Sequence, residues 1–138
     1  MKKTEVSAVI DKIEIKSNKK SELIDITDAV QGIVEKSGVK EGMCVVYCPH
    51  TTTAIIVSEG ADPNVQTDII NALNRLVPAS STYAHREGNS DAHIKSAMIG
   101  NSRTILIKDG KLVLGTWEAC FFCEFDGSKS RKAIVLVK

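Results

Sequence analysis

Two of the chain's three histidines, His85 and His93, lie in one polar stretch between Tyr83 and Gly100. Imidazole binds metals and exchanges protons near neutral pH, so this stretch is the first candidate for chemistry. In a straight strand, residues eight positions apart lie roughly 26 Å from each other, too far to share one ligand. The turn-forming residues 88–91 can reverse the chain between them. Either the two imidazoles meet through this reversal, or they serve different purposes.

The third histidine, His50, follows Pro49 at the end of an apolar run and precedes three threonines. Three histidines with an open fourth position can form a catalytic zinc site. The same side chains can instead grip a phosphate, helped by hydroxyl groups and a helix N-terminus. Although these histidines lie up to 43 positions apart, we expect His50, His85 and His93 to converge on one site.

Acids, amides and hydroxyls accompany the histidines. The candidates are Thr51, Thr52, Glu59, Asp62, Asp68, Asn89, Ser90 and Asp91. Asp62 precedes Pro63, an order typical of a helix N-terminus, so capping competes with catalysis for its role. The sequence has no glycine-rich phosphate loop, no Gly-x-Ser-x-Gly and no His-Glu-x-x-His. Nucleotide-binding loops and hydrolase elbows are therefore unsupported.

Two helices are predicted to position these groups. The first runs over residues 28–36, with Thr27 as its cap and Gly38 as its stop. The second begins at Pro63 and ends before Pro78, with apolar residues repeating at helical spacing. Both are amphipathic, so each needs a sheet to cover its apolar side.

Seven segments are predicted to be strands, because their apolar and polar residues alternate or because they are continuously apolar. They are residues 4–16, 43–47, 52–57, 103–107, 111–114, 117–125 and 132–137. Asp109 and Gly110 between two of them indicate a tight hairpin. Two helices followed by antiparallel strands define an α+β protein, and a length of 138 residues predicts a single domain over residues 1–138.

Composition excludes several classes of protein. The chain is 43% hydrophobic and 25% charged with a net charge of +1, so nothing favours a nucleic-acid or membrane partner. No apolar run approaches the ~20 residues of a membrane span. Acidic residues interrupt the start of the chain, as a secretory signal does not allow. We therefore expect a cytoplasmic protein.

Four cysteines form two close pairs, Cys44 with Cys48 and Cys120 with Cys123. The second pair has the spacing of a zinc or redox motif. It lies in a strand-like segment, where residues three apart point to opposite faces. Buried, reduced thiols are the favoured interpretation, and a metal site or disulfide is the alternative.

Taken in order, the motifs resemble one known family. They are His50-Thr51-Thr52, Glu59, Asp62-Pro63, Asp68, Tyr83-x-His85, Asn89-Ser90-Asp91-Ala92-His93, Gly100-x-Ser102, Leu114-Gly115-Thr116-Trp117, and Glu124-x-Asp126-Gly127 with Arg131. Each motif is weak alone, but their order and spacing over residues 13–137 are specific. The chain resembles the secondary thiamine-phosphate synthase family, also called YjbQ-like.

The resemblance implies an α+β fold whose antiparallel sheet is barrel-like, with two helices packed on it, and assembly as a homotrimer. It implies a transferase that joins hydroxymethylpyrimidine diphosphate to thiazole phosphate and releases pyrophosphate, an activity that can be a side reaction. The implied partner is a small phosphorylated metabolite, and the implied cofactor is a divalent metal, zinc or magnesium. The site is then expected in a cleft at a subunit boundary.

The resemblance also distributes roles among residues. It makes His50, His85 and His93 the metal or phosphate ligands. The catalytic set is His50, Glu59, Asp62, Asn89 and Asp91, and the substrate-binding set is Thr51, Thr52, Arg86, Lys95, Trp117 and Arg131.

Two positions depart from the family's usual pattern. Glu118 stands where a glutamine usually follows the tryptophan, and Ser128-Lys129 replace Pro-Arg. The second change keeps a cation but loses a planar fork that suits phosphate, which leaves the substrate open. A metal-dependent hydrolase and a non-catalytic binder of a small phosphorylated metabolite are the alternatives to the transferase.

Overall fold

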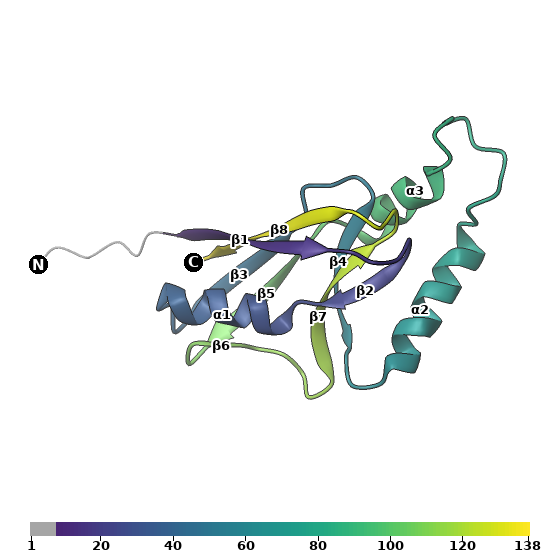
Figure 1. Ribbon diagram of the computed structural model, residues 1–138. Helices are drawn as coiled ribbons and strands as arrows, with labels where there is room; N and C mark the ends of the chain where they lie inside the picture. The colour runs from purple at the N-terminus through teal and green to yellow at the C-terminus, as the bar shows by residue number, and fades with distance from the viewer. Residues whose placement is uncertain (1–7) are drawn as a thin grey trace, which may run out of the picture.

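The computed structural model describes residues 8–138 and shows two antiparallel sheets (Figure 1). The first has the order β1 (Val9–Lys16), β8 (Ser130–Val137), β3 (Gly42–Tyr47), β5 (Ser102–Lys108), β6 (Lys111–Leu112), and the second has the order β2 (Glu22–Asp25), β7 (Glu118–Glu124), β4 (Thr53–Glu59). The sheets curl around a shared core. The expected α+β fold with a barrel-like antiparallel sheet is confirmed.

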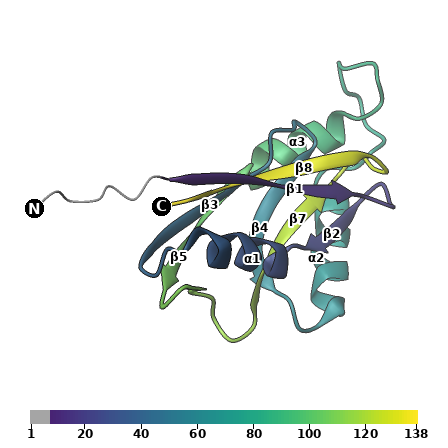
Figure 2. The same ribbon diagram turned by 60° about the vertical axis from the view of Figure 1, so that its left-hand side comes forward.

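Three helices cover the sheets, α1 (Thr27–Ser37), α2 (Pro63–Leu76) and α3 (Ser90–Ile99). Figures 1 and 2 show α1 on one side of the molecule and α2 and α3 on the other. Helix α1 buries Val30, Ile33 and Val34 at helical spacing. Helix α2 buries only Leu73 fully, so it packs more loosely than α1.

Strand β7 is the central element of the core, because both of its faces are covered. Cys120 and Phe122 face the main cluster of buried side chains, which includes α1. Cys123 faces a second cluster under α2 and α3, with Leu73 and Ala92. A strand buried on both faces reads as a continuous apolar run, as β7 does.

The thiols are all buried and free, as the sequence indicated. Burial raises the pKa of Cys44 to about 11 and that of Cys120 to about 12. Both groups therefore stay protonated at neutral pH and behave as small apolar side chains.

None of the helices within residues 8–138 has the length and apolar composition of a membrane-spanning segment.

Several local predictions need correction. Two helices were expected, but α3 is a third helix, and strand β2 was not predicted. Thr27 is not a cap: the N-cap residue of α1 is Ile26, and the Thr27 hydroxyl donates to Asp25. Residues 4–7 of the expected first strand lie outside the described residues.

The tight hairpin between β5 and β6 is confirmed. Asp109 and Gly110 have φ of 52° and 74°. Positive φ at both central residues is what a two-residue turn of this handedness requires.

Candidate functional site

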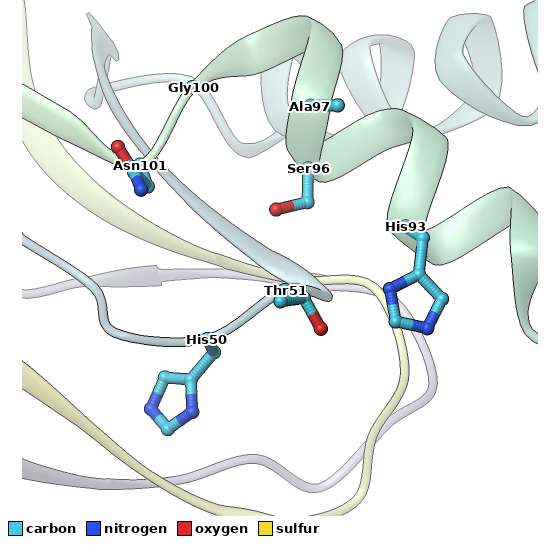
Figure 3. A pocket seen from close by; sticks show the side chains of 7 residues that line it. All are labelled: His50, Thr51, His93, Ser96, Ala97, Gly100 and Asn101. Atoms are coloured by element: carbon cyan, nitrogen blue, oxygen red, sulfur yellow. The ribbon is translucent and has the colours of Figure 1, made fainter.

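A cavity of about 360 Å³ opens between the β3–β4 loop and α3 (Figure 3). Its lining residues are His50, Thr51, His93, Ser96, Ala97, Gly100 and Asn101. This volume lies within the ~300–1,000 Å³ of small-molecule sites. The lining combines two imidazoles with hydroxyl and amide groups, so it suits a small polar ligand.

One face of α3 supplies a wall of the cavity. The lining residues from this segment are three or four positions apart, a spacing that puts side chains on one helix face. They are His93, Ser96, Ala97 and Gly100. The Ser96 hydroxyl donates to the carbonyl oxygen of Thr53 over 2.6 Å and holds the helix against β4. The position of His93 therefore depends on the seating of α3.

His50 belongs to the β3–β4 loop and forms the side of the cavity opposite α3 (Figure 3). Its Nε2 lies 3.1 Å from the backbone nitrogen of Lys132, and its ring meets Phe122 edge to face with centroids 6.3 Å apart. Burial and then the charge of Arg131 lower the pKa of His50 below its ordinary value. The ring is thus held neutral at physiological pH.

A buried ion pair lies behind His50. Arg131 donates from Nε and Nη2 to the two carboxylate oxygens of Glu124, over 2.9 and 2.7 Å. Ser17 and the backbone of Asp126 also donate to this carboxylate, and Arg131 Nη2 reaches the Thr52 hydroxyl at 2.7 Å. Burial raises the pKa of Glu124, but these hydrogen bonds outweigh it and hold the pKa below its ordinary value.

A second buried charge cluster lies on α3, within one turn of His93. The Nζ of Lys20 lies 3.1 Å and that of Lys95 lies 3.5 Å from Asp91 Oδ2. Lys95 also donates to Asn74 Oδ1 at 2.7 Å, which ties α3 to α2. Burial raises the pKa of the Asp91 carboxyl group. The hydrogen bond and charge of Lys20, together with the charge of Lys95, outweigh burial and hold this pKa below its ordinary value. Burial lowers the pKa of Lys95.

His85 lies on the long connection between α2 and α3, which projects from the body (Figure 1). Its ring meets that of His93 edge to face, with centroids 5.4 Å apart. The structure therefore brings His85 to His93, and His93 to the same cavity as His50. Arg86 is exposed on this connection.

The expected zinc centre is not seen among the described residues, and the divalent metal stays a prediction. Among residues 8–138, no group of three or more histidine, cysteine, aspartate or glutamate side chains could hold a metal ion. His85 and His93 contact each other, but His50 is anchored to Lys132 on β8. The chain reversal brings the rings of His85 and His93 together, while His50 lies in the β3–β4 loop on another side of the cavity.

Three of the expected site residues, Glu59, Asp62 and Trp117, lie at the far end of the β4–β7 pair. Strand β4 runs from Thr53 beside the cavity to Glu59, a span of about 20 Å. Asp62 caps α2 by accepting from Asn64 N at 2.9 Å. Within one chain, these residues are separated from the cavity.

The other expected residues are held by protein partners. Asn89 donates to Asp126 at 3.0 Å. Thr52, Asp91, Lys95 and Arg131 belong to the two buried charge clusters, and Thr51 lines the cavity. Their catalytic and substrate-binding roles stay predictions.

Sequence reasoning missed four groups: Glu124 as a partner of Arg131, the backbone of Lys132, and the cavity residues Ser96 and Asn101. A signal existed for the first. Glu124 and Arg131 carry opposite charges at the two ends of the short connection between β7 and β8, which can bring the two side chains together although the strands belong to different sheets. Ser96 and Asn101 gave none, because α3 itself was not predicted.

Proteins of one family with solved structures share this α+β half-barrel. Residues 11–138 match the family described as UPF0047 protein YjbQ-like. The chain belongs to this family.

Relatives support this assignment over nearly full length. The chain is 50% identical to UPF0047 protein MJ1081 of Methanocaldococcus jannaschii, covering 96% of each chain. It is 39% identical to UPF0047 protein YugU of Bacillus subtilis, covering 89% of this chain and 94% of the relative. A crystal structure of a YjbQ/UPF0047 family protein from Clostridium acetobutylicum superposes with a TM-score of 0.92 at 45% identity, covering 93% of this chain and 99% of that one.

The thiamine part of the resemblance is corrected by these comparisons. The family match and the relatives carry the UPF0047 description and nothing that links them to thiamine-phosphate synthase. The transferase that joins two thiamine precursors is therefore a wrong prediction. It rested on motifs that identify the YjbQ-like fold and not a reaction.

Proposed function

We propose that the cavity between the β3–β4 loop and α3 binds the anionic group of a small phosphorylated metabolite. The supporting observation is that two imidazoles, His50 and His93, line one cavity of about 360 Å³ together with hydroxyl and amide side chains. Imidazole, hydroxyl and amide N–H and O–H groups are all donors that phosphate oxygens accept from.

The balance of donors favours an anion over a cation. No carboxylate lines the cavity among the described residues. The buried carboxylate behind His50, that of Glu124, is already occupied by Arg131, Ser17 and the backbone of Asp126. An anion entering the cavity therefore meets hydrogen-bond donors without an unpaired negative charge.

The test is a titration with inorganic phosphate, followed by the imidazole NMR signals of the three histidines. Saturable shifts of His50 and His93 are expected, and His93→Gln is expected to weaken binding about 10-fold, equivalent to ~1.4 kcal/mol. His85→Gln is the matched control, because His85 contacts His93 without lining the cavity. Equal affinity in wild type, His50→Gln and His93→Gln would refute the proposal.

We also propose that the protein is a homotrimer whose cavity lies in a cleft between subunits. The outer face of the first sheet supports self-association, because it exposes a strip of apolar side chains. Met43 pairs with Leu106, which is 60% exposed, and Tyr47 and Ile10 are exposed on the same sheet. Apolar strips of this kind mark protein interfaces.

Sedimentation velocity tests the assembly. We expect a trimer at micromolar concentration, and Leu106→Asp should dissociate it while Lys108→Asp, on the same face of β5, should weaken it less. A wild-type monomer at that concentration would refute both the trimer and the shared cleft.

We further propose a cytoplasmic location, supported by four buried thiols without a disulfide, which is usual in a reducing compartment. Cell fractionation tests it. Recovery of the protein in a secreted or membrane fraction would contradict it.

A further inference from the structure

His50 continues the β3–β8 ladder where β3 ends. The last pair of that ladder is Tyr47 opposite Ile134. Two residues further along β8, the backbone nitrogen and oxygen of Lys132 lie 3.1 and 3.2 Å from His50 Nε2. In an antiparallel ladder, the N–H and the carbonyl of one residue point to the same neighbour. The imidazole therefore occupies the position that a continued β3 would fill.

This contact selects a tautomer. A neutral imidazole has one donor nitrogen and one acceptor nitrogen. A backbone N–H rarely stays without an acceptor, whereas an underused carbonyl is more common. Nε2 of His50 therefore accepts from the Lys132 N–H, and the ring proton is on Nδ1. Among residues 8–138, no hydrogen bond of the protein engages Nδ1 of His50.

The loop and the strand that meet at this contact are fixed by one residue, Arg131. Its Nη2 donates to the Thr52 hydroxyl, two positions after His50, and its backbone precedes Lys132. Glu124 holds the guanidinium through both carboxylate oxygens. Such a bidentate pair fixes orientation as well as distance.

We propose that Glu124 and Arg131 are positioning residues that set the tautomer of His50. The ion pair holds the β3–β4 loop against β8, so that His50 accepts through Nε2 and offers Nδ1–H as a donor. A donor at this wall matches an anion, and this last step rests on the proposed function of the cavity. Neither Glu124 nor Arg131 touches the ligand in this account.

The experiment is long-range ¹H–¹⁵N NMR of the full-length protein, with the three histidines assigned from His→Gln variants. The wild type is expected to show His50 protonated at Nδ1 and not at Nε2. Arg131→Lys keeps the charge but loses the fork, and we expect it to give a mixture of the two His50 tautomers and about 10-fold weaker phosphate binding. Lys129→Arg is the matched control, since Lys129 pairs with Asp126 at the surface.

A second variant keeps the test decisive if Arg131→Lys does not fold. Thr52→Val removes only the hydroxyl that Arg131 reaches, and we expect the same mixture of tautomers with native signals elsewhere. A wild-type His50 protonated at Nε2, or an unchanged tautomer in both variants, overturns the proposal. If the tautomers behave as expected but wild type binds no phosphate, the anion site is wrong while the positioning role is supported.

Discussion

Two buried ion pairs stand behind the two histidine walls of the cavity, and they are built differently. Glu124 and Arg131 make two hydrogen bonds to each other, at 2.9 and 2.7 Å, and both carboxylate oxygens have partners. In the other cluster Lys95 lies 3.5 Å from Asp91 and is only 1% exposed. The Oδ1 atom of Asp91 has no hydrogen-bond partner among the described residues.

The two ion pairs hold the two walls of the cavity with different rigidity. A planar fork that meets a carboxylate along two bonds fixes both groups, whereas an ammonium shared between a carboxylate and an amide does not. His50 therefore belongs to a rigid wall. His93 lies on α3, where the contact between Lys95 and Asp91 is longer, at 3.5 Å, and where Lys95 reaches α2 through the amide of Asn74. Any adjustment to a ligand should come from the α3 side.

The largest expected effect is at the rigid wall. Glu124→Gln keeps the side-chain shape but leaves the buried Arg131 charge without its partner. Removing one member of a buried ion pair costs about 3–5 kcal/mol, so we expect a loss of this size in the free energy of unfolding, measured by urea denaturation.

Two companions sharpen this measurement. Glu124→Gln combined with Arg131→Met removes both charges and should recover part of the loss. Glu14→Gln breaks an exposed contact with Lys12, and it should change stability by about 0–1 kcal/mol. If Glu124→Gln costs no more than this surface change, the wall is not held as described.

The next effect is at the adjustable wall. Lys95→Met removes the buried ammonium and fills similar volume, while Asp91 keeps Lys20 as a partner. We expect a loss of about 2–3 kcal/mol, less than for Glu124→Gln, because the remaining carboxylate is still paired. Lys36→Met on the exposed side of α1 is the control. If Lys95→Met costs as much stability as Glu124→Gln, the two ion pairs hold their walls equally strongly and the proposed difference between the walls is wrong.

Much of this frame could be predicted from sequence where local chemistry decides the structure. The Asp62-Pro63 start of α2, the left-handed Gly38 at the end of α1 and the Asp109-Gly110 hairpin are all as expected. Each is determined by one or two residues whose backbone preferences are strong.

Helix α3 could not be predicted in the same way. Its first residues, Ser90 and Asp91, are turn formers by local preference, and its apolar residues form no clear stripe. The helix is held instead by distant partners, through Ser96 to Thr53 and Lys95 to Asn74. Tertiary contacts override a weak local preference here. Because α3 forms part of the cavity, the shape of the cavity could not be predicted from the sequence. Its two histidines could be identified as candidate site residues.

Acidification distinguishes the two clusters by a smaller amount. The pKa of Glu124 and that of Asp91 both lie below their ordinary values in the folded protein. As pH falls, the unfolded chain takes up protons first, so stability is present above pH ~4 and is lost as pH falls through the native pKa values. Glu124→Gln should flatten this loss by up to about 1.4 kcal/mol per pH unit.

Urea denaturation between neutral and acidic pH measures this slope. Asp91→Asn should flatten it less than Glu124→Gln, because one oxygen of Asp91 has no partner to hold it ionised. A steeper slope in either variant than in wild type would contradict the assignment of these carboxylates as ionised in the folded state.

The smallest effect tests whether the two lysines on Asp91 substitute for each other. The Lys20 side chain is half exposed, and it lies 3.1 Å from Asp91. Lys20→Ala should therefore cost only about 0–1 kcal/mol on its own. In the Lys95→Met background, the same change leaves Asp91 buried without either lysine, so its cost should rise. The loss of stability in the double variant should then exceed the sum of the two single losses by about 0.5–3 kcal/mol. A double-mutant cycle in urea measures this coupling, with Lys19→Ala as the neighbouring control. Strictly additive losses would show that Lys20 and Lys95 stabilise α3 independently and do not share Asp91 as a common partner.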